Sequence, residues 1–189
     1  MHRTSAVTEK IQELITPYLA TLGLVPWGVE LAAAGHRQVV RLYLDLAPET
    51  PRTPERQGVT IDECARVSRH LGSLLEVEEI FHGPCVLEVS SPGFGRRFFE
   101  PGQLPAYIGR EIEARLIAPR DGRKRFRGIL TAAEGNRVSM TVDPASKTFP
   151  LSFDFEEAEK IRLIHAFDAI SEGGADDDGA SSGTSEVTP

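Results

Sequence analysis

The side chains best suited to bind an anion lie at residues 86–97. This segment reads Val-Leu-Glu-Val-Ser-Ser-Pro-Gly-Phe-Gly-Arg-Arg, an apolar run followed by two hydroxyls, a Pro-Gly pair and two guanidiniums. Proline fixes its own φ and glycine admits a positive φ, so the pair predicts a rigid turn directly after a strand. Paired arginines beside such a turn suit a phosphate or a carboxylate. A polar turn that only joins two domains is the alternative. The candidate residues are Ser90, Ser91, Pro92, Gly93, Arg96 and Arg97.

A second basic cluster lies at residues 120–127, which read Arg-Asp-Gly-Arg-Lys-Arg-Phe-Arg. The Asp-Gly pair predicts a hairpin tip with basic residues on both sides. If Phe126 points into a core, its two neighbours share the outer face of one strand. Such a patch suits backbone phosphates, which position a nucleic acid without reading its sequence. An ordinary solvated hairpin is the alternative. The candidate residues are Arg120, Arg123, Lys124, Arg125 and Arg127.

Three carboxylates in the first half of the chain form a third candidate set. Asp45 ends a predicted strand, and Asp62 and Glu63 open a predicted helix. If they meet, they form an acidic surface that favours a basic protein over RNA. Alternatively, Asp62 and Glu63 only stabilise the start of the helix, where negative charge is favourable.

The sequence lacks the constellations that enzymes and metal sites need. It has no nucleophile elbow between a predicted strand and a predicted helix, and no glycine-rich phosphate loop ahead of a lysine. The five histidines show no metal-ligand spacing. A zinc site would need residues as distant as Cys64, His70, His82 and Cys85 to converge. We therefore expect no catalysis, no cofactor and no bound metal.

The distribution of charge argues against non-specific nucleic-acid binding by the whole surface. The 189 residues carry a formal net charge of −7. Residues 1–105 contribute −3, residues 106–170 contribute +1, and residues 171–189 contribute −5. Because this last segment has almost nothing to bury, we expect it to be a disordered acidic tail. Local contact through a basic loop, or through an acidic surface, stays open.

Cysteine usage and hydropathy predict the compartment. The two cysteines do not form a Cys-x-x-Cys pair, and each lies in a predicted apolar element, so we expect both to be reduced and buried. No apolar stretch approaches the roughly 20 residues that span a bilayer, and no secretory signal is visible. These features predict a cytoplasmic protein without a membrane partner.

The first 100 residues show the periodicities of a small α/β domain. Helical and alternating patterns follow one another in the order α-β-β-α-β, which predicts a small sheet with two helices on one face. Thr60 and Glu63 form a capping box ahead of the second helix. Its apolar stripe is expected at Ile61, Cys64, Val67, Leu71 and Leu74. The expected elements are a helix at 8–22 ending at Gly23, strands at 25–31 and 40–44 joined around Gly35, a loop at 48–58, a helix at 61–74 and a strand at 85–89.

After Pro101, Gly102 and Pro105 the pattern changes to short strands at close spacing. Five such strands in about 60 residues predict a small β-barrel. The fold class is therefore α+β, with domains at 1–100 and 101–170 and the tail at 171–189. The expected strands are 111–118, 125–132, 138–142, 148–153 and 160–164, with turns at 121–122, 134–136 and 143–144 and one helical turn at 155–158.

The segment at residues 86–97 resembles the signature of the bacterial ribosome maturation factor RimP family, roughly L-E-V-S-S-P-G-hydrophobic-D-R-P-L. Residues 87–93 match this pattern without a break, and Arg96 matches its arginine. The chain departs from the pattern at Gly95, where an aspartate is usual, and at Arg97, where a proline is usual. Residues 43–45 (Tyr-Leu-Asp) and 58–69 resemble two further family segments in the same order. The resemblance covers about residues 8–165.

This resemblance implies an α/β N-terminal domain, an SH3-like or Sm-like C-terminal barrel and a non-enzymatic role. The implied partner is the immature small ribosomal subunit, including its RNA and the ribosomal protein near the decoding centre. We expect a monomer that holds this particle at two contacts, the signature turn and the basic hairpin. The alternative is a standalone small-barrel adaptor that binds a peptide or a short RNA.

Overall fold

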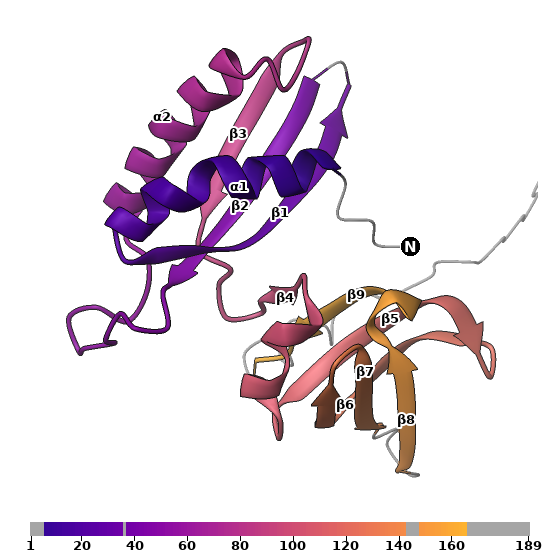
Figure 1. Ribbon diagram of the computed structural model, residues 1–189. Coiled ribbons are helices and arrows are strands. Elements are labelled where there is room, and N and C mark those ends of the chain that lie inside the picture. The colour runs from indigo at the N-terminus through magenta and orange to yellow at the C-terminus, as the bar shows by residue number, and fades with distance from the viewer. Residues whose placement is uncertain (1–5, 36, 143–147, 166–189) are drawn as a thin grey trace, which may run out of the picture.

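The computed structural model describes residues 6–35, 37–142 and 148–165, which form two sheets in sequence order (Figure 1). The first sheet has the strand order β1-β2-β3 and the second has the order β4-β9-β5-β6-β7-β8. We call the part from α1 to β3 the N-terminal half and the part from β4 onward the C-terminal half. The N-terminal half consists of α1 (Ala6–Thr21), β1 (Leu24–Ala34), β2 (Arg37–Leu46), α2 (Ile61–Val77) and β3 (Cys85–Ser90).

In the N-terminal half both helices cover one face of the sheet (Figure 1). Strands β1 and β2 form an antiparallel hairpin that turns at Gly35, whose φ is +62°. Strand β3 pairs with β2 in parallel, and α2 makes the crossover between them. The predicted order α-β-β-α-β is confirmed.

The core of this half forms because every second residue of β2 from Val40 to Leu46 is apolar and buried. Val40 and Leu42 point towards the helices and pack with Ile15 of α1 and Leu71 of α2, all of them fully buried. Burial of each such side chain stabilises the fold by about 1.5–3 kcal/mol. The other face of β2 is left for polar contacts, which include the candidate site.

Two expectations for this half are wrong. The buried stripe of α2 contains Glu63, Val67, Leu71 and Leu75 at a spacing of four, so Ile61 lies outside the stripe and is 88% exposed. Cys85 is exposed because it lies on an edge strand, whereas Cys64 is partly buried. Both thiols are free. Thr60 and Glu63 do form the predicted capping box.

The C-terminal half is a six-stranded antiparallel sheet around one apolar core. Register shifts in β5 and β6 mark irregularities of the kind that bend strands, and side chains from all six strands reach this core. The elements are β4 (Arg97–Phe98), η1 (Pro101–Gln103), η2 (Pro105–Tyr107), β5 (Glu111–Arg120), β6 (Arg123–Glu134), β7 (Arg137–Val142), β8 (Phe149–Asp154), η3 (Phe155–Glu157) and β9 (Ala158–Leu163).

Five of these strands and the turn at Asp121 and Gly122 match the prediction, and β4 was not expected. The sheet is not a closed barrel, because its edge strands β4 and β8 do not pair within the described ranges. The predicted turn at 143–144 and the predicted tail at 171–189 lie outside the described residues. None of the described helices is long and apolar enough to cross a membrane.

Candidate functional site

The signature arginines lie between the two halves of the molecule. The carboxylate of Asp45, at the end of β2, accepts hydrogen bonds from Nη1 of Arg96 at 2.7 Å and from Nη2 of Arg52 at 2.9 Å. Asp45 is only 7% exposed, and the backbone N–H of Leu46 donates to the same carboxylate. Arg96 therefore joins the N-terminal sheet to the first residues of the C-terminal half.

Aromatic side chains enclose the Arg96 guanidinium. Its Cζ lies 4.8 Å from the centre of the Trp27 ring, and its Nη1 also donates to the hydroxyl of Tyr107 at 2.7 Å. The indole N–H of Trp27 donates to the carbonyl of Arg97 at 2.7 Å, and the side chain of Gln103 donates to the carbonyl of Trp27 at 2.6 Å. We call the contacts of Asp45, Trp27, Arg96 and Tyr107 the junction brace.

Arg97 makes a second link between the halves. It forms an ion pair with Glu30 of β1, and Glu30 also accepts from the hydroxyl of Tyr43 at 2.9 Å. The ring of Phe99 lies under the Arg97 guanidinium and 5.5 Å from the ring of Tyr43. This packing needs the glycine at position 28, because a Cβ there would lie 2.1 Å from the Phe99 ring.

The contacts between the two halves perturb two titratable groups, Asp45 of the junction brace and Tyr43 beside Glu30. Burial by itself raises the pKa of Asp45, but the hydrogen bonds from Arg52, from Arg96 and from the backbone outweigh it, so the pKa of this carboxyl is lowered. Burial, reinforced by the hydrogen bond to Glu30, raises the pKa of Tyr43 to about 12. Asp45 therefore stays ionised and Tyr43 stays neutral near neutral pH, which keeps the junction contacts intact.

The rest of the signature turn faces outward. Ser90 and Ser91 are exposed, and Gly93 has a φ of +68°, which confirms the predicted positive-φ turn. Phe94 is 78% exposed, although its ring lies 5.1 Å from that of His165. The groups that this turn exposes to solvent are thus two hydroxyls and an aromatic ring, while the arginines join the two halves.

The five candidate cations of the basic hairpin fall into two sets. Arg120 donates to the carbonyl of Ser152 and pairs with Glu157 at 2.9 Å, and Arg127 pairs with Glu111 at 2.7 Å. These two cations are neutralised within the sheet. The hairpin tip carries the other three, which are exposed and form no ion pair in the described part of the chain: Arg123, Lys124 and Arg125.

The exposed cations continue across the outer face of the sheet. Arg115 of β5 lies directly opposite Arg125 of β6 on one side and Lys160 of β9 on the other. All three are exposed, and Arg115 pairs with Glu159 at 2.9 Å. Like charges on directly opposite residues destabilise a sheet unless an anion lies near them. We call Arg115, Arg123, Lys124, Arg125 and Lys160 the cation face.

The comparisons with known proteins identify the family. A sequence profile of the RimP N-terminal domain matches residues 14–95. The chain is 44% identical over 169 residues to the ribosome maturation factor RimP of Nitratidesulfovibrio vulgaris strain DP4, covering 86% of this chain and 92% of the relative. It is 36% identical over 190 residues to the protein of that name from strain Miyazaki F, covering 87% and 84%. The chain belongs to the RimP family of ribosome maturation factors. Its role is therefore in ribosome maturation.

The structure accounts for the two departures of this RimP-family chain from the signature. Position 95 is a glycine and offers no carboxylate, and Arg96 pairs with Asp45. Asp45 ends the Tyr-Leu-Asp segment that also resembles the family. Arg97, which replaces the usual proline, pairs with Glu30. The chain thus keeps the signature arginine in place through contacts far away in the sequence.

The three candidate carboxylates do not form one exposed acidic surface. Asp45 is part of the junction brace, and Glu63 is buried by its capping contacts and its ion pair with Arg56 at 2.6 Å. Only Asp62 is exposed. A protein-binding role for this set stays a prediction. Among the described residues no group of three or more His, Cys, Asp or Glu side chains is placed to hold a metal ion.

Sequence reasoning missed the residues that complete the junction. Trp27 was predicted only as part of an alternating strand, and Gln103 and Tyr107 end short 3-10 helices that begin at prolines. One signal was present: aromatic residues flank the two adjacent arginines on both sides, at Phe94 and at positions 98 and 99. Aromatic rings beside paired guanidiniums are typical of a stacked, buried site.

Proposed function

We propose that this chain binds an immature small ribosomal subunit in the cytoplasm, as a monomer, and assists assembly by contact without catalysis. Membership of the RimP family gives the broader role in ribosome maturation. The small subunit as the partner is the finer proposal, since the relatives' names specify only ribosome maturation. The resemblance of residues 86–97 to the family signature and the exposed cations support it together.

The cation face is the observation that carries this proposal. It combines three unpaired cations at the hairpin tip with a row of opposed like charges, Arg125, Arg115 and Lys160. Among the described residues, Arg115 alone of this row forms an ion pair, with Glu159, so a polyanion over the row would offset the remaining repulsion between like charges. Ribosomal RNA supplies closely spaced phosphates, which basic side chains contact without reading sequence.

We further propose that the two halves are separate domains. Each half has its own sheet and its own hydrophobic core, which supports this division. Because β4 pairs with β9, we place the boundary in this proposal just before Arg97. The curved C-terminal sheet then corresponds to the SH3-like architecture that the family resemblance implies, with β4 and β8 as its unpaired edges.

The signature turn forms the second contact in this proposal. Ser90, Ser91 and Phe94 are exposed beside the junction, where a flat ring and two hydroxyls can meet an unstacked base or a protein loop. The junction brace keeps this turn and the cation face at a fixed separation. A fixed separation lets both contacts form without further loss of conformational freedom on binding.

Charge reversal of the hairpin tip tests the proposal. We expect the triple variant Arg123→Glu, Lys124→Glu and Arg125→Glu to bind purified small-subunit assembly particles at least about tenfold more weakly. The slope of the logarithm of the binding constant against the logarithm of the salt concentration should fall by the equivalent of about two to three phosphate contacts. The matched control reverses the exposed residues Arg37, Arg66 and Arg69, which changes the net charge equally on the other half. Equal losses in both triples would reduce the effect to bulk charge and refute the cation face as a site.

A further inference from the structure

Strand β3 leaves one edge of the N-terminal sheet open. It is the last strand in the order β1-β2-β3, and no strand of the described residues pairs with its outer side. The backbone N–H of Gln38 in β2 donates to the carbonyl of Pro84, and the two strands run parallel. In a parallel ladder the bonding groups alternate, so the N–H and C=O groups of Cys85, Leu87 and Val89 point away from β2. These groups can accept an added strand.

The only charged residue of β3 is Glu88, which pairs with Arg41 of the neighbouring strand β2. The six residues of β3, Cys-Val-Leu-Glu-Val-Ser, include neither a lysine nor a proline, which are the usual protections of an edge strand. Pro84 precedes it by one residue and Pro92 follows two residues after it, so the open edge is limited to about six residues. An added segment would therefore be short.

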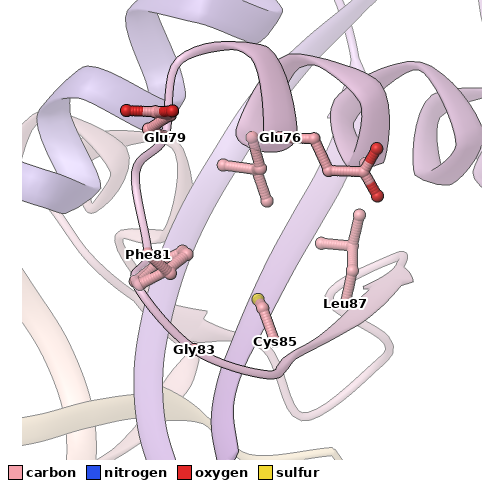
Figure 2. A pocket seen from close by; sticks show the side chains of 8 residues that line it. Glu76, Glu79, Phe81, Gly83, Cys85 and Leu87 are labelled. Atoms are coloured by element: carbon pink, nitrogen blue, oxygen red, sulfur yellow. The ribbon is translucent and has the colours of Figure 1, made fainter.

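A pocket lies beside this edge, between α2 and β3 (Figure 2). Its volume is about 380 Å³, and Leu75, Phe81 and Leu87 give it an apolar lining. Figure 2 shows Glu76 and Glu79 at the pocket, on the helix and just after its end. Both glutamates are exposed, and neither forms an ion pair in the part of the chain that the structure describes.

Strand geometry links the edge to the pocket. A segment paired with β3 would lie about 4.8 Å away from it, and every second side chain would project to the face on which Leu87 lies. That face carries the pocket, so one side chain of the added strand would enter it. The side chain two residues before or after would lie near Glu76 or Glu79 and would be stabilised there by positive charge.

We propose that the open edge of β3 and this pocket bind an extended peptide segment of a partner protein as an added strand. The segment carries an apolar side chain for the pocket and a lysine or arginine for the two glutamates. RNA does not fit, because these carboxylates repel phosphate. The chain's own residues 171–189 do not fit either, since they carry five acidic residues and no Lys or Arg. This site goes beyond the proposed function, because it lies on the other half from the cation face and takes a protein.

The test uses the full chain and synthetic probe peptides. The probe, called the Val-Lys peptide, is a blocked peptide of about eight residues in which every second residue is Thr and the positions between are alternately Val and Lys, so that Val and Lys lie two residues apart on one face. One control, the Val-Glu peptide, has Glu in place of each Lys, and another has the Val-Lys sequence with every second backbone nitrogen methylated. We expect the probe to bind, and to slow the hydrogen exchange of the Cys85, Leu87 and Val89 amides. Both control peptides should bind at least about fivefold more weakly.

A pair of surface variants separates this site from general charge effects. Glu76→Lys with Glu79→Lys should weaken binding of the Val-Lys peptide by about tenfold. The matched control, Glu13→Lys with Glu49→Lys, changes the net charge equally at exposed positions elsewhere on this half and should leave binding unchanged. Equal binding of the Val-Glu peptide, binding without protection of the three amides, or no binding of the probe would overturn the proposal. Preferential binding of a short RNA at this edge would overturn it as well.

Discussion

Replacing Arg96 by alanine is expected to destabilise the junction more than any comparable change of a surface arginine. The side chains of Arg96 and Asp45 are 17% and 9% exposed, so solvent screens their ion pair only weakly. The lost charge-assisted hydrogen bonds are worth about 1.5–3 kcal/mol and the lost stacking on Trp27 about 1 kcal/mol. Because Arg52 still pairs with Asp45, we expect a net loss of about 3 kcal/mol in the free energy of unfolding.

The assay can observe the junction directly, because Trp27 is the only tryptophan of the chain. Urea unfolding is followed by Trp27 fluorescence and by far-UV circular dichroism in parallel. In Arg96→Ala the fluorescence midpoint should fall by about 1–2 M urea, ahead of the dichroism midpoint, since the junction opens before the sheets unfold. Arg96→Lys keeps the charge but not the fork geometry, and should lose about half as much.

Arg137→Ala provides the matched control. Its ion pair with Asp154 spans 3.2 Å between side chains that are 57% and 52% exposed, so its loss should change stability by less than about 0.5 kcal/mol. If Arg96→Ala and Arg137→Ala behave alike, or if the Trp27 signal does not change in Arg96→Ala, the reasoning about the junction brace is wrong.

Three further changes test other parts of the structure. Gly28→Ala should cost about 2 kcal/mol or more, because its Cβ would overlap the Phe99 ring, and adding Phe99→Ala should recover part of this loss in urea melts. Gly93→Ala should cost about 1 kcal/mol through its positive φ alone, since its Cβ would meet no atom; an unchanged melting temperature would contradict the turn. The lowered pKa of Asp45 gives stability that is fully present above the ordinary carboxyl pKa and is lost as the pH falls through the folded-state value. The stability gap between the wild type and Asp45→Asn should therefore shrink as the pH falls below the ordinary carboxyl pKa and through the lower folded-state pKa of Asp45, and a constant gap would contradict the assignment.

The helices and strands of the N-terminal half could be predicted because their signals lie in residues close together in the sequence. Thr60 and Glu63 of the capping box are three positions apart, and the apolar alternation of β2 is visible within the strand from Val40 to Leu46. The same reasoning failed at Ile61, because a capping glutamate and not an apolar residue opens the buried stripe. A two-residue strand such as β4 has no periodicity to detect.

Local sequence could not show which groups the side chains of Arg96 and Arg97 contact. Arg96 meets Asp45 at a separation of 51 residues, and Trp27 meets the Arg97 carbonyl at a separation of 70. The sequence showed two guanidiniums beside a rigid turn, which fits an external anion as well as an internal carboxylate. Likewise, the basic hairpin was visible in the sequence, but only the strand register separates the neutralised Arg120 and Arg127 from the exposed tip.

The central claim is that this chain binds small ribosomal subunits while they are immature. Co-sedimentation of the full chain with immature and with mature small subunits, at low and at moderate salt, tests it most directly. We predict preferential binding to the immature particles, weakened by salt and by reversal of Arg123, Lys124 and Arg125. Equal binding to both particles, or binding to neither, would contradict the claim.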